Sequence, residues 1–234
     1  MRKQRGALAR ASLAGTVMVA VLAFGLAAWP AQAAAGSPVA AGGCTTTITG
    51  THDRPVTIGP GVTCLYQAII SGGLRIEAGA AVAIQGSKVM GPFYAHRPAR
   101  LAMCGSMISG PAAVTGATGP VVLGGASGGA DGAPCTADII TGLVTLTGDS
   151  RGVTLEGATI SGPAHVAGND GRVTVSGNII GGPARVTGNT GGTMVAGNTI
   201  DGPLSCSGNK PAPDDPGKPN TTSGPASGQC SRRP

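Results

Sequence analysis

The sequence predicts an all-β protein, a right-handed parallel β-helix in which each turn of a coiled chain is built from short strands. Three observations predict this fold: a period of 20 residues, aliphatic residues in alternating columns within each period, and glycine at the bends. A fixed period of this length is typical of solenoid proteins, whose repeats bury their apolar side against one another. No helical periodicity competes with it after residue 33.

The period is most regular in the C-terminal half of the chain. Four isoleucines stand 20 residues apart, and Ile70, Met90 and Ile108 continue the series less regularly toward the N-terminus. The four regular anchors are Ile140, Ile160, Ile180 and Ile200. With one turn per interval, we expect about seven to eight turns, stacked about 4.8 Å apart.

Aliphatic residues recur four and six positions after each anchor. Because positions two apart share one face of a strand, we expect both columns to point inward. The sixth position holds Ile76, Val114, Leu146, Val166, Val186 and Cys206. A second alternating pair follows in each repeat, as at Val153 and Leu155, with Thr193 as the exception in its column. Together with the anchor strand, each turn should contain three short strands.

The bends recur in the same register. Gly-Pro marks one corner and Gly-Asn another, and both glycine and asparagine tolerate the left-handed backbone that tight corners need. Stacked asparagine side chains can also hydrogen-bond the backbone and one another along the column. The predicted ladders contain Asn169, Asn189 and Asn209, with Asp149 before them, and Asn178 and Asn198. Crossovers between parallel strands favour a right-handed coil. The competing interpretation, a disordered Gly/Ala-rich chain, does not explain columns kept in register.

The first 33 residues have the order of a secretory signal peptide: a basic start, an apolar run from Leu13 to Trp29, and the small-residue site at residues 31–33. A membrane anchor is the alternative, but the run is short and ends in Pro30. We therefore expect a secreted chain without stable membrane insertion after cleavage. The expected parts are a signal peptide (1–33), a flexible start (34–43), the β-helix (44–209) with an inserted loop (124–138), and a Pro/Gly-rich tail (210–234).

The composition of the mature chain excludes some partners. Four of the 16 basic residues leave with the signal peptide, so that 12 remain against 10 acidic residues, a net charge of +2. This removes the main support for a nucleic-acid partner. The aromatic residues that remain are Tyr66, Phe93 and Tyr94. A core without large rings favours many thin layers over one thick globule.

Six cysteines follow the signal peptide, an even number that indicates disulfides in an exported chain. No CxxC or His/Cys metal spacing is present in the sequence, and we expect no metal and no cofactor. Six cysteines allow fifteen pairings. Stacking of neighbouring turns favours Cys44–Cys64, Cys104–Cys135 and Cys206–Cys230, the last of which would tether the tail across the end of the coil.

The sequence offers little support for catalysis. Glycoside hydrolysis requires two carboxylates about 5 to 10 Å apart, and lyase chemistry on this fold needs an acidic cluster that binds calcium. The acidic residues instead fall in different columns of the repeat. The inserted loop is Gly/Ala-rich, and its only charged residues are Asp131 and Asp138. We interpret it as a loop without a function of its own that a disulfide ties to the coil.

The strongest local anomaly is GPFYAHRPAR, residues 91–100, which interrupts the repeat. It gathers the candidate ligand-binding residues Phe93, Tyr94, His96, Arg97 and Arg100. One interpretation is a recognition patch for an anionic or glycan partner, with Arg75 and Glu77 close by. The other, which we favour, is that a shortened turn needs bulk to fill an irregular corner near Cys104.

The tail LSCSGNKPAPDDPGKPNTTSGPASGQC, residues 204–230, is the most specific part of a resemblance that covers roughly residues 44–230. The chain resembles the secreted right-handed parallel β-helix repeat proteins of bacteria, in particular a group of small uncharacterised exported proteins. The resemblance implies the fold and implies no activity. We expect a monomeric structural or interaction module of the cell envelope or extracellular space that is not an enzyme. Its partner would be a cell-wall or extracellular glycan or another envelope protein. The alternative is a carbohydrate-binding or carbohydrate-active β-helix protein.

Overall fold

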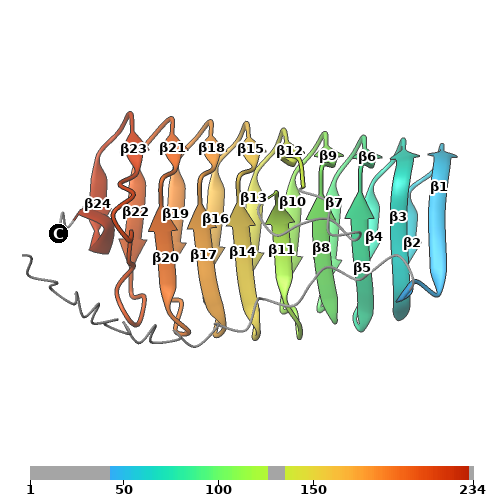
Figure 1. Cartoon of the computed structure of the whole chain (residues 1–234), viewed down its shortest axis with the longest axis horizontal. Helices are drawn as coiled ribbons and strands as arrows, with labels where there is room; N and C mark the ends of the chain where they lie inside the picture. Colours follow the sequence, from blue (N-terminus) through green and yellow to red (C-terminus); the bar gives the residue numbers. More distant parts are fainter. Residues whose placement is uncertain (1–42, 126–134, 232–234) are drawn as a thin grey trace, which may run out of the picture. The chain divides into compact units, whose positions relative to one another are not determined.

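A computed structural model of the chain describes residues 43–125 and 135–231 (Figure 1). These residues belong to the compact unit Ala34–Pro234. The predicted signal peptide, residues 34–42 and the centre of the inserted loop with Asp131 lie outside the described residues. The described residues form 24 β-strands and a short 3-10 turn, η2 (Gln229–Ser231), and contain no α-helix.

The strands form a parallel β-solenoid with three strands per turn, as the sequence predicts (Figure 1). Face one contains β2 (Val56–Ile58), β4 (Leu74–Ile76), β7 (Phe93–His96), β10 (Ala112–Thr115), β13 (Val144–Thr147), β16 (Ala164–Ala167), β19 (Ala184–Thr187), β22 (Leu204–Ser207) and β24 (Ala226–Gly228). Face two contains β5 (Ala80–Gln85), β8 (Arg100–Cys104), β11 (Val121–Gly124), β14 (Gly152–Glu156), β17 (Arg172–Ser176) and β20 (Thr193–Ala196). Face three contains β6 (Lys88–Val89), β9 (Met107–Ile108), β12 (Ile139–Ile140), β15 (Thr159–Ile160), β18 (Ile179–Ile180), β21 (Thr199–Ile200) and β23 (Thr221–Thr222).

Two longer strands start the coil and join faces two and three. They are β1 (Thr46–His52) and β3 (Gly61–Ile70), and the two ends of β3 pair separately with β5 and β6. Face one has nine strands, so the coil has about nine turns, more than the seven to eight that the sequence predicts. Part of the difference lies in the segment predicted as a tail, because β23 and β24 pair with β21 and β22 and continue the coil.

The core is a set of stacked aliphatic columns. The inward column of face one runs from Ile76 through Val114 and Leu146 to Cys206, and all four side chains are buried. The predicted alternation is therefore confirmed, since outward neighbours such as Thr145 remain partly exposed. At the Gly-Pro corner the turns approach so closely that a Cβ on Gly142 would lie 2.6 Å from the carbonyl carbon of Gly110, and only glycine fits.

The first predicted asparagine column forms a buried ladder, which we call ladder one. It consists of Asp149, Asn169, Asn189, Asn209 and Gln229. The Asn169 backbone N–H and Nδ2 donate to Asn189 Oδ1 at 3.0 and 2.9 Å, and Asn189 Nδ2 donates to the Val166 carbonyl at 3.4 Å. Each amide thus satisfies backbone groups that a tight, water-free corner would otherwise leave unpaired.

A second column forms ladder two, which extends further toward the N-terminus than the sequence indicates. It consists of Ser87, Ser106, Asp138, Asn178, Asn198 and Asn220. The backbone N–H of Ala68 donates to Ser87 Oγ at 3.1 Å, and the column is interrupted at Ala158, whose side chain carries no acceptor. Asn220 begins an Asn-Thr-Thr sequence, and its side-chain amide accepts hydrogen bonds from Asn198 and donates one to the Val195 carbonyl.

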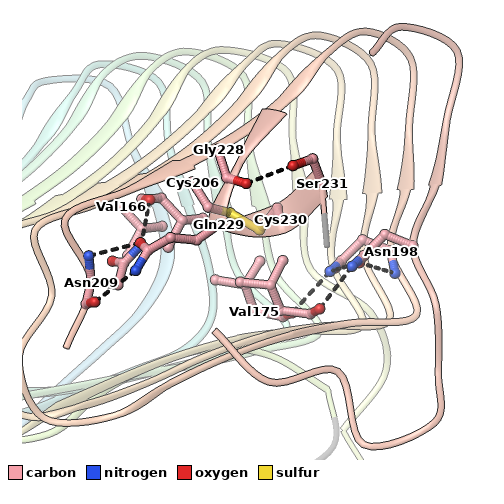
Figure 2. The surroundings of a disulfide bond; sticks show 12 residues. Val166, Val175, Asn198, Cys206, Asn209, Gly228, Gln229, Cys230 and Ser231 are labelled. Carbon is pink, nitrogen blue, oxygen red and sulfur yellow. Dashed lines mark hydrogen bonds between the residues drawn. A yellow bond between two sulfur atoms is a disulfide. The ribbon is translucent and has the colours of Figure 1, made fainter. Parts of the chain in front are cut away.

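The three predicted disulfides are present, and they join cysteines whose Cα atoms lie 5.8 Å apart for Cys44–Cys64 and 5.2 Å apart for Cys104–Cys135 and Cys206–Cys230. Figure 2 shows the last pair at the C-terminal end, where Cys230 packs against the core. Beside it, Gln229 Oε1 accepts hydrogen bonds from the Asn209 backbone N–H and Nδ2, and Gln229 Nε2 donates to the Asn209 carbonyl at 2.9 Å. Ladder one is therefore closed at this end.

Candidate functional site

The structure divides the predicted patch at residues 91–100 between the core and the surface. Phe93 is completely buried, because it points inward from β7 between Leu74 and Ala112 of the neighbouring strands. It therefore cannot contact a ligand on the outer face, and its inclusion in the recognition patch is wrong. Its ring supplies bulk in a column that is mostly aliphatic, and it does so within strand β7 and not at a corner.

Tyr94 and His96 point outward from the same strand and lie near two charged side chains, Arg75 of β4 and Glu77 directly after it. Arg75 lies directly beside Tyr94 in the register of face one. Arg75 Nε and Glu77 Oε1 are 3.5 Å apart, and His96 Nδ1 lies 3.3 Å from Thr115 Oγ1. We call Arg75, Glu77, Tyr94 and His96 the face-one patch. The structure thus brings four of the suspected residues onto one flat sheet surface.

Arg97 and Arg100 lie outside this patch. Arg97 occupies the corner after β7 with a φ of 48°, and Arg100 begins β8 on face two, beside Ala81. The sheet corner therefore separates Arg100 from Arg75, Glu77 and His96. The patch itself contains one carboxylate, already paired with Arg75, whereas glycoside hydrolysis uses two. Across residues 43–125 and 135–231, no group of three His, Cys, Asp or Glu side chains has the arrangement of a metal site.

A second surface feature was missed by the sequence analysis. Large apolar side chains are exposed at seven positions in the described part of the chain, and five of them follow face three and the corner that leads from it to face one. These five, which we call the face-three stripe, are Ile69, Met90, Ile139, Leu143 and Ile179. The signal was available as isoleucine doublets, because one residue of each doublet must face outward when its neighbour faces the core.

Two acidic side chains are buried in the ladders. Burial raises the pKa of Asp138 to about 6, although the backbone N–H groups of Ser106 and Gly124 donate to its two oxygens and lower it. Burial likewise raises the pKa of Asp149 to about 6, against one N–H from Ala117. Asp149 Oδ2 has no hydrogen-bond partner. Both carboxyls hold the coil together from within and are not exposed to an external substrate.

Comparison of the chain with known protein families, with curated proteins and with solved structures found no match. The fold therefore stands on the structure alone. In the described residues no helix has the length and apolar character needed to cross a bilayer. The three disulfides indicate an oxidising environment outside the cytoplasm.

Proposed function

We propose that the chain is secreted and acts as a structural or interaction module of the cell envelope or extracellular space, in the manner of the bacterial right-handed β-helix proteins that its sequence resembles. Disulfides at both ends and at the inserted loop, together with the two buried ladders, support a stiff scaffold. A stiff surface binds a partner without first paying the entropy of ordering loops. The face-one patch holds a single, paired carboxylate, which favours recognition over catalysis.

The observation that carries the proposal is the face-three stripe. Its five side chains are between 39% and 57% exposed, and in the outward column of face three Lys88 lies beside Ile69 while Thr159 lies between Ile139 and Ile179, so the apolar surface has polar interruptions. They are isoleucine, methionine and leucine, so the surface lacks the aromatic platforms on which sugars stack. A second protein of the envelope with an aliphatic face of its own is therefore the partner that this surface suits best.

The test is to substitute Ile139→Lys and Ile179→Lys together in the secreted protein and to cross-link it in intact cells beside the wild type. Both positions point outward, so the variant should fold, which circular dichroism checks. We expect a defined cross-linked protein to disappear in this variant and to persist in an Arg75→Ala, Tyr94→Ala control. Persistence of the cross-linked protein in the isoleucine variant would contradict the proposal, as would the absence of any such protein from the wild type.

A second candidate function is glycan binding at the face-one patch, which the juxtaposition of Arg75 and Tyr94 favours. A ring beside a guanidinium matches an acidic sugar, whose ring face stacks and whose carboxylate pairs with arginine. Co-sedimentation with insoluble peptidoglycan and binding to soluble acidic polysaccharides test this candidate. Binding that is lost in the Arg75→Ala, Tyr94→Ala variant and retained in the isoleucine variant would favour the glycan over the protein partner, and release of new sugar ends would show catalysis.

A further inference from the structure

The two ends of the coil are finished in different ways. Figure 1 shows β1 at the N-terminal end and β23 and β24 at the other. The end of a stacked parallel sheet exposes unpaired backbone N–H and C=O groups, which are a template for pairing with a further strand. In residues 43–125 and 135–231, β1 pairs with β3 alone and β2 pairs with β4 alone. The outer edges of β1 and β2 therefore form the N-terminal end of the coil.

The C-terminal end is blunted by the chain itself. The tail covers the edge of β20, since the Val195 N–H donates to the Asp214 carbonyl at 2.9 Å and the Gly197 N–H donates to the Lys218 carbonyl at 2.7 Å. The other two faces end in β23 and β24, which are two and three residues long. Proline removes further backbone donors from this end, at Pro211, Pro213, Pro216, Pro219 and Pro225. This end therefore lacks a strand edge on which a second coil could stack.

The edge strand β1 has none of these protections. It is seven residues long, contains four threonines and one isoleucine, and has no proline, lysine, arginine or acidic residue. Natural edge strands are usually protected by short length, charged side chains or proline, and β-branched residues favour strand pairing. The Cys44–Cys64 disulfide and the bond from Thr45 Oγ1 to the Val62 carbonyl, at 2.8 Å, hold the start of β1 on the second turn. The edge is thus ordered before a partner arrives, which lowers the entropy cost of pairing.

The hydrophobic core is also incompletely covered at the N-terminal end. Ile48 of β1 and Val56 of β2 pack against the core and are only partly buried. Their neighbours in the next turn, Leu65 and Leu74, are each 1% exposed. The terminal turns of a solenoid need a cover over the core that the inner turns obtain from one another. A partner at this end would therefore bury apolar surface and also pair backbone groups.

The free backbone groups of β2 belong to Thr57. The Val56 N–H donates to the Gly73 carbonyl at 3.0 Å, and the Ile58 carbonyl accepts from the Glu77 N–H at 2.9 Å. Successive residues of a strand direct their N–H and C=O groups to opposite sides, so Thr57 directs both of its groups away from β4 and toward the open end. Two copies of β2 that run antiparallel, with Thr57 opposite Thr57, would exchange both hydrogen bonds of such a pair.

We propose that the partner at this end is a second copy of the chain, in a head-to-head dimer about a twofold axis that passes between the two Thr57 residues. The axis is perpendicular to the coil. In a three-sided coil, a line from the middle of face one leads to the opposite corner, which in the first turn is the bend of β1 between Ile48 and Gly50, where its register with β3 shifts. The same axis therefore sets β1 of one copy antiparallel to β1 of the other.

The charges and the symmetry of the first turn suit this dimer. Its charged residues, Asp53 and Arg54, cancel each other and lie at the corner after β1, away from the axis. Because the contact uses the same surface on both copies and the C-terminal ends are blunted, the assembly closes at two copies and does not grow into a fibre. The dimer replaces the monomer that the sequence analysis expects. It does not depend on the proposed envelope partner, since it leaves faces one and three free.

Sedimentation equilibrium of the secreted, oxidised protein tests the proposal. We expect a dimer with a dissociation constant in the micromolar range, because the end of a coil offers a small interface. Thr57→Pro removes the free N–H and no bond within the chain, so it should fold, as circular dichroism checks, and weaken the dimer at least about tenfold. Thr57→Val keeps the N–H and should dimerise as the wild type does. A monomer at every concentration would mean that the edge is covered in another way, and would overturn the proposal.

Cysteine cross-linking locates the contact. The Cα atoms of a hydrogen-bonded antiparallel pair lie about 5.5 Å apart, which a disulfide can span, so Thr57→Cys should give a covalent dimer on mild oxidation. The matched control is Thr145→Cys, in the same outward column of face one but on β13, which should not cross-link. The variant with Ile139→Lys and Ile179→Lys should still dimerise. Loss of the dimer in that variant, or equal cross-linking at both cysteines, would place the contact on a face of the coil and refute the proposal.

Discussion

The turns after the inserted loop and the turns before it hold their corners in different ways. After the loop, most ladder residues are asparagines spaced by 20, whereas before it ladder two uses Ser87 and Ser106, spaced by 19. Asn178 accepts from the turn before it and also donates to the Leu155 carbonyl of that turn, at 2.8 Å. Ser87 accepts from the turn before it but donates within its own turn, to Gln85. An asparagine therefore ties two turns together by more hydrogen bonds than a serine does.

The corners and the covalent links show the same contrast. In the early turns Gln67 and Arg97 adopt φ values of 49° and 48°, at corners where most other turns have glycine. A left-handed backbone costs a residue with a side chain about 1–2 kcal/mol. Two of the three disulfides, Cys44–Cys64 and Cys104–Cys135, join strands or loops of this early region. Side-chain ladders therefore hold the regular turns, while covalent bonds support the turns that carry the irregular surface residues.

The largest expected effect comes from breaking the asparagine ladder at its centre. Asn189→Ala would leave the Asn169 N–H without its acceptor in a dry corner and remove the hydrogen bonds to the Val166 carbonyl and to Asn209, and should lower the free energy of unfolding by about 3–5 kcal/mol. The matched change in the serine ladder, Ser87→Ala, removes one acceptor and should cost about 1–2 kcal/mol. Urea unfolding of the oxidised proteins measures both. Equal losses would show that the two ladders contribute alike.

Removal of an early disulfide should come next in size. A Cys104→Ser, Cys135→Ser variant removes a disulfide between residues 31 apart in the sequence. Its free energy of unfolding should fall by about 3 kcal/mol, because the unfolded chain gains the conformational entropy that the disulfide had restricted. Because each turn of a solenoid contacts only its neighbours, the loss should be local. Hydrogen exchange should quicken in β8 and β11 while β16 and β19 keep their protection. Uniform loss of protection would mean that the coil unfolds as a single unit.

Asp149 is the first residue of ladder one after the inserted loop, and replacing it with asparagine should stabilise the protein. Asn169 Nδ2 donates to the Leu146 carbonyl, but Asp149 carries no equivalent donor. The register places Val114 opposite Leu146, so Asp149→Asn should donate to the Val114 carbonyl and contribute about 1–2 kcal/mol at neutral pH.

The pH dependence of that gain has a definite sign. Because burial raises the pKa of Asp149 from 3.8 to about 6, its contribution to stability is complete below pH 3.8 and is lost as the pH rises through about 6. The advantage of the asparagine variant should therefore grow between pH 4 and pH 6.5 in thermal unfolding. Asp138, whose pKa is raised to a similar value, keeps its own part of the dependence in both proteins. A gain that is independent of pH would show that folding does not shift the pKa of Asp149.

Features that repeat could be predicted from the sequence, and features that occur once could not. The inward columns, the asparagine ladders and the disulfide pairing follow from spacing, because each turn repeats the same kind of residue at the same position and so confirms the register. Phe93 lies in an interrupted repeat, where a shift of one residue moves a side chain from the surface to the core, and the sequence alone did not fix its direction. The tail could not be placed for a related reason: the exception at Thr193 was visible, but the Pro-rich segment that pairs Asp214 with Met194 has no repeat to align.

The smallest effect tests the irregular corners directly. Arg97→Gly would place at this position the residue that most later turns use, and should relieve the left-handed strain of an arginine at φ 48°. Part of this gain is offset because glycine makes the unfolded chain more flexible, so the net stabilisation should be about 0.5–1 kcal/mol. The control is Gly168→Ala at an equivalent corner, where a Cβ has open space but the φ of 62° remains unfavourable, and which should lose about 1 kcal/mol. If Arg97→Gly instead destabilises the protein, then the arginine side chain stabilises that corner by contacts of its own. The departure from glycine at this corner would then be a stabilising feature of the early turns and not a strained irregularity.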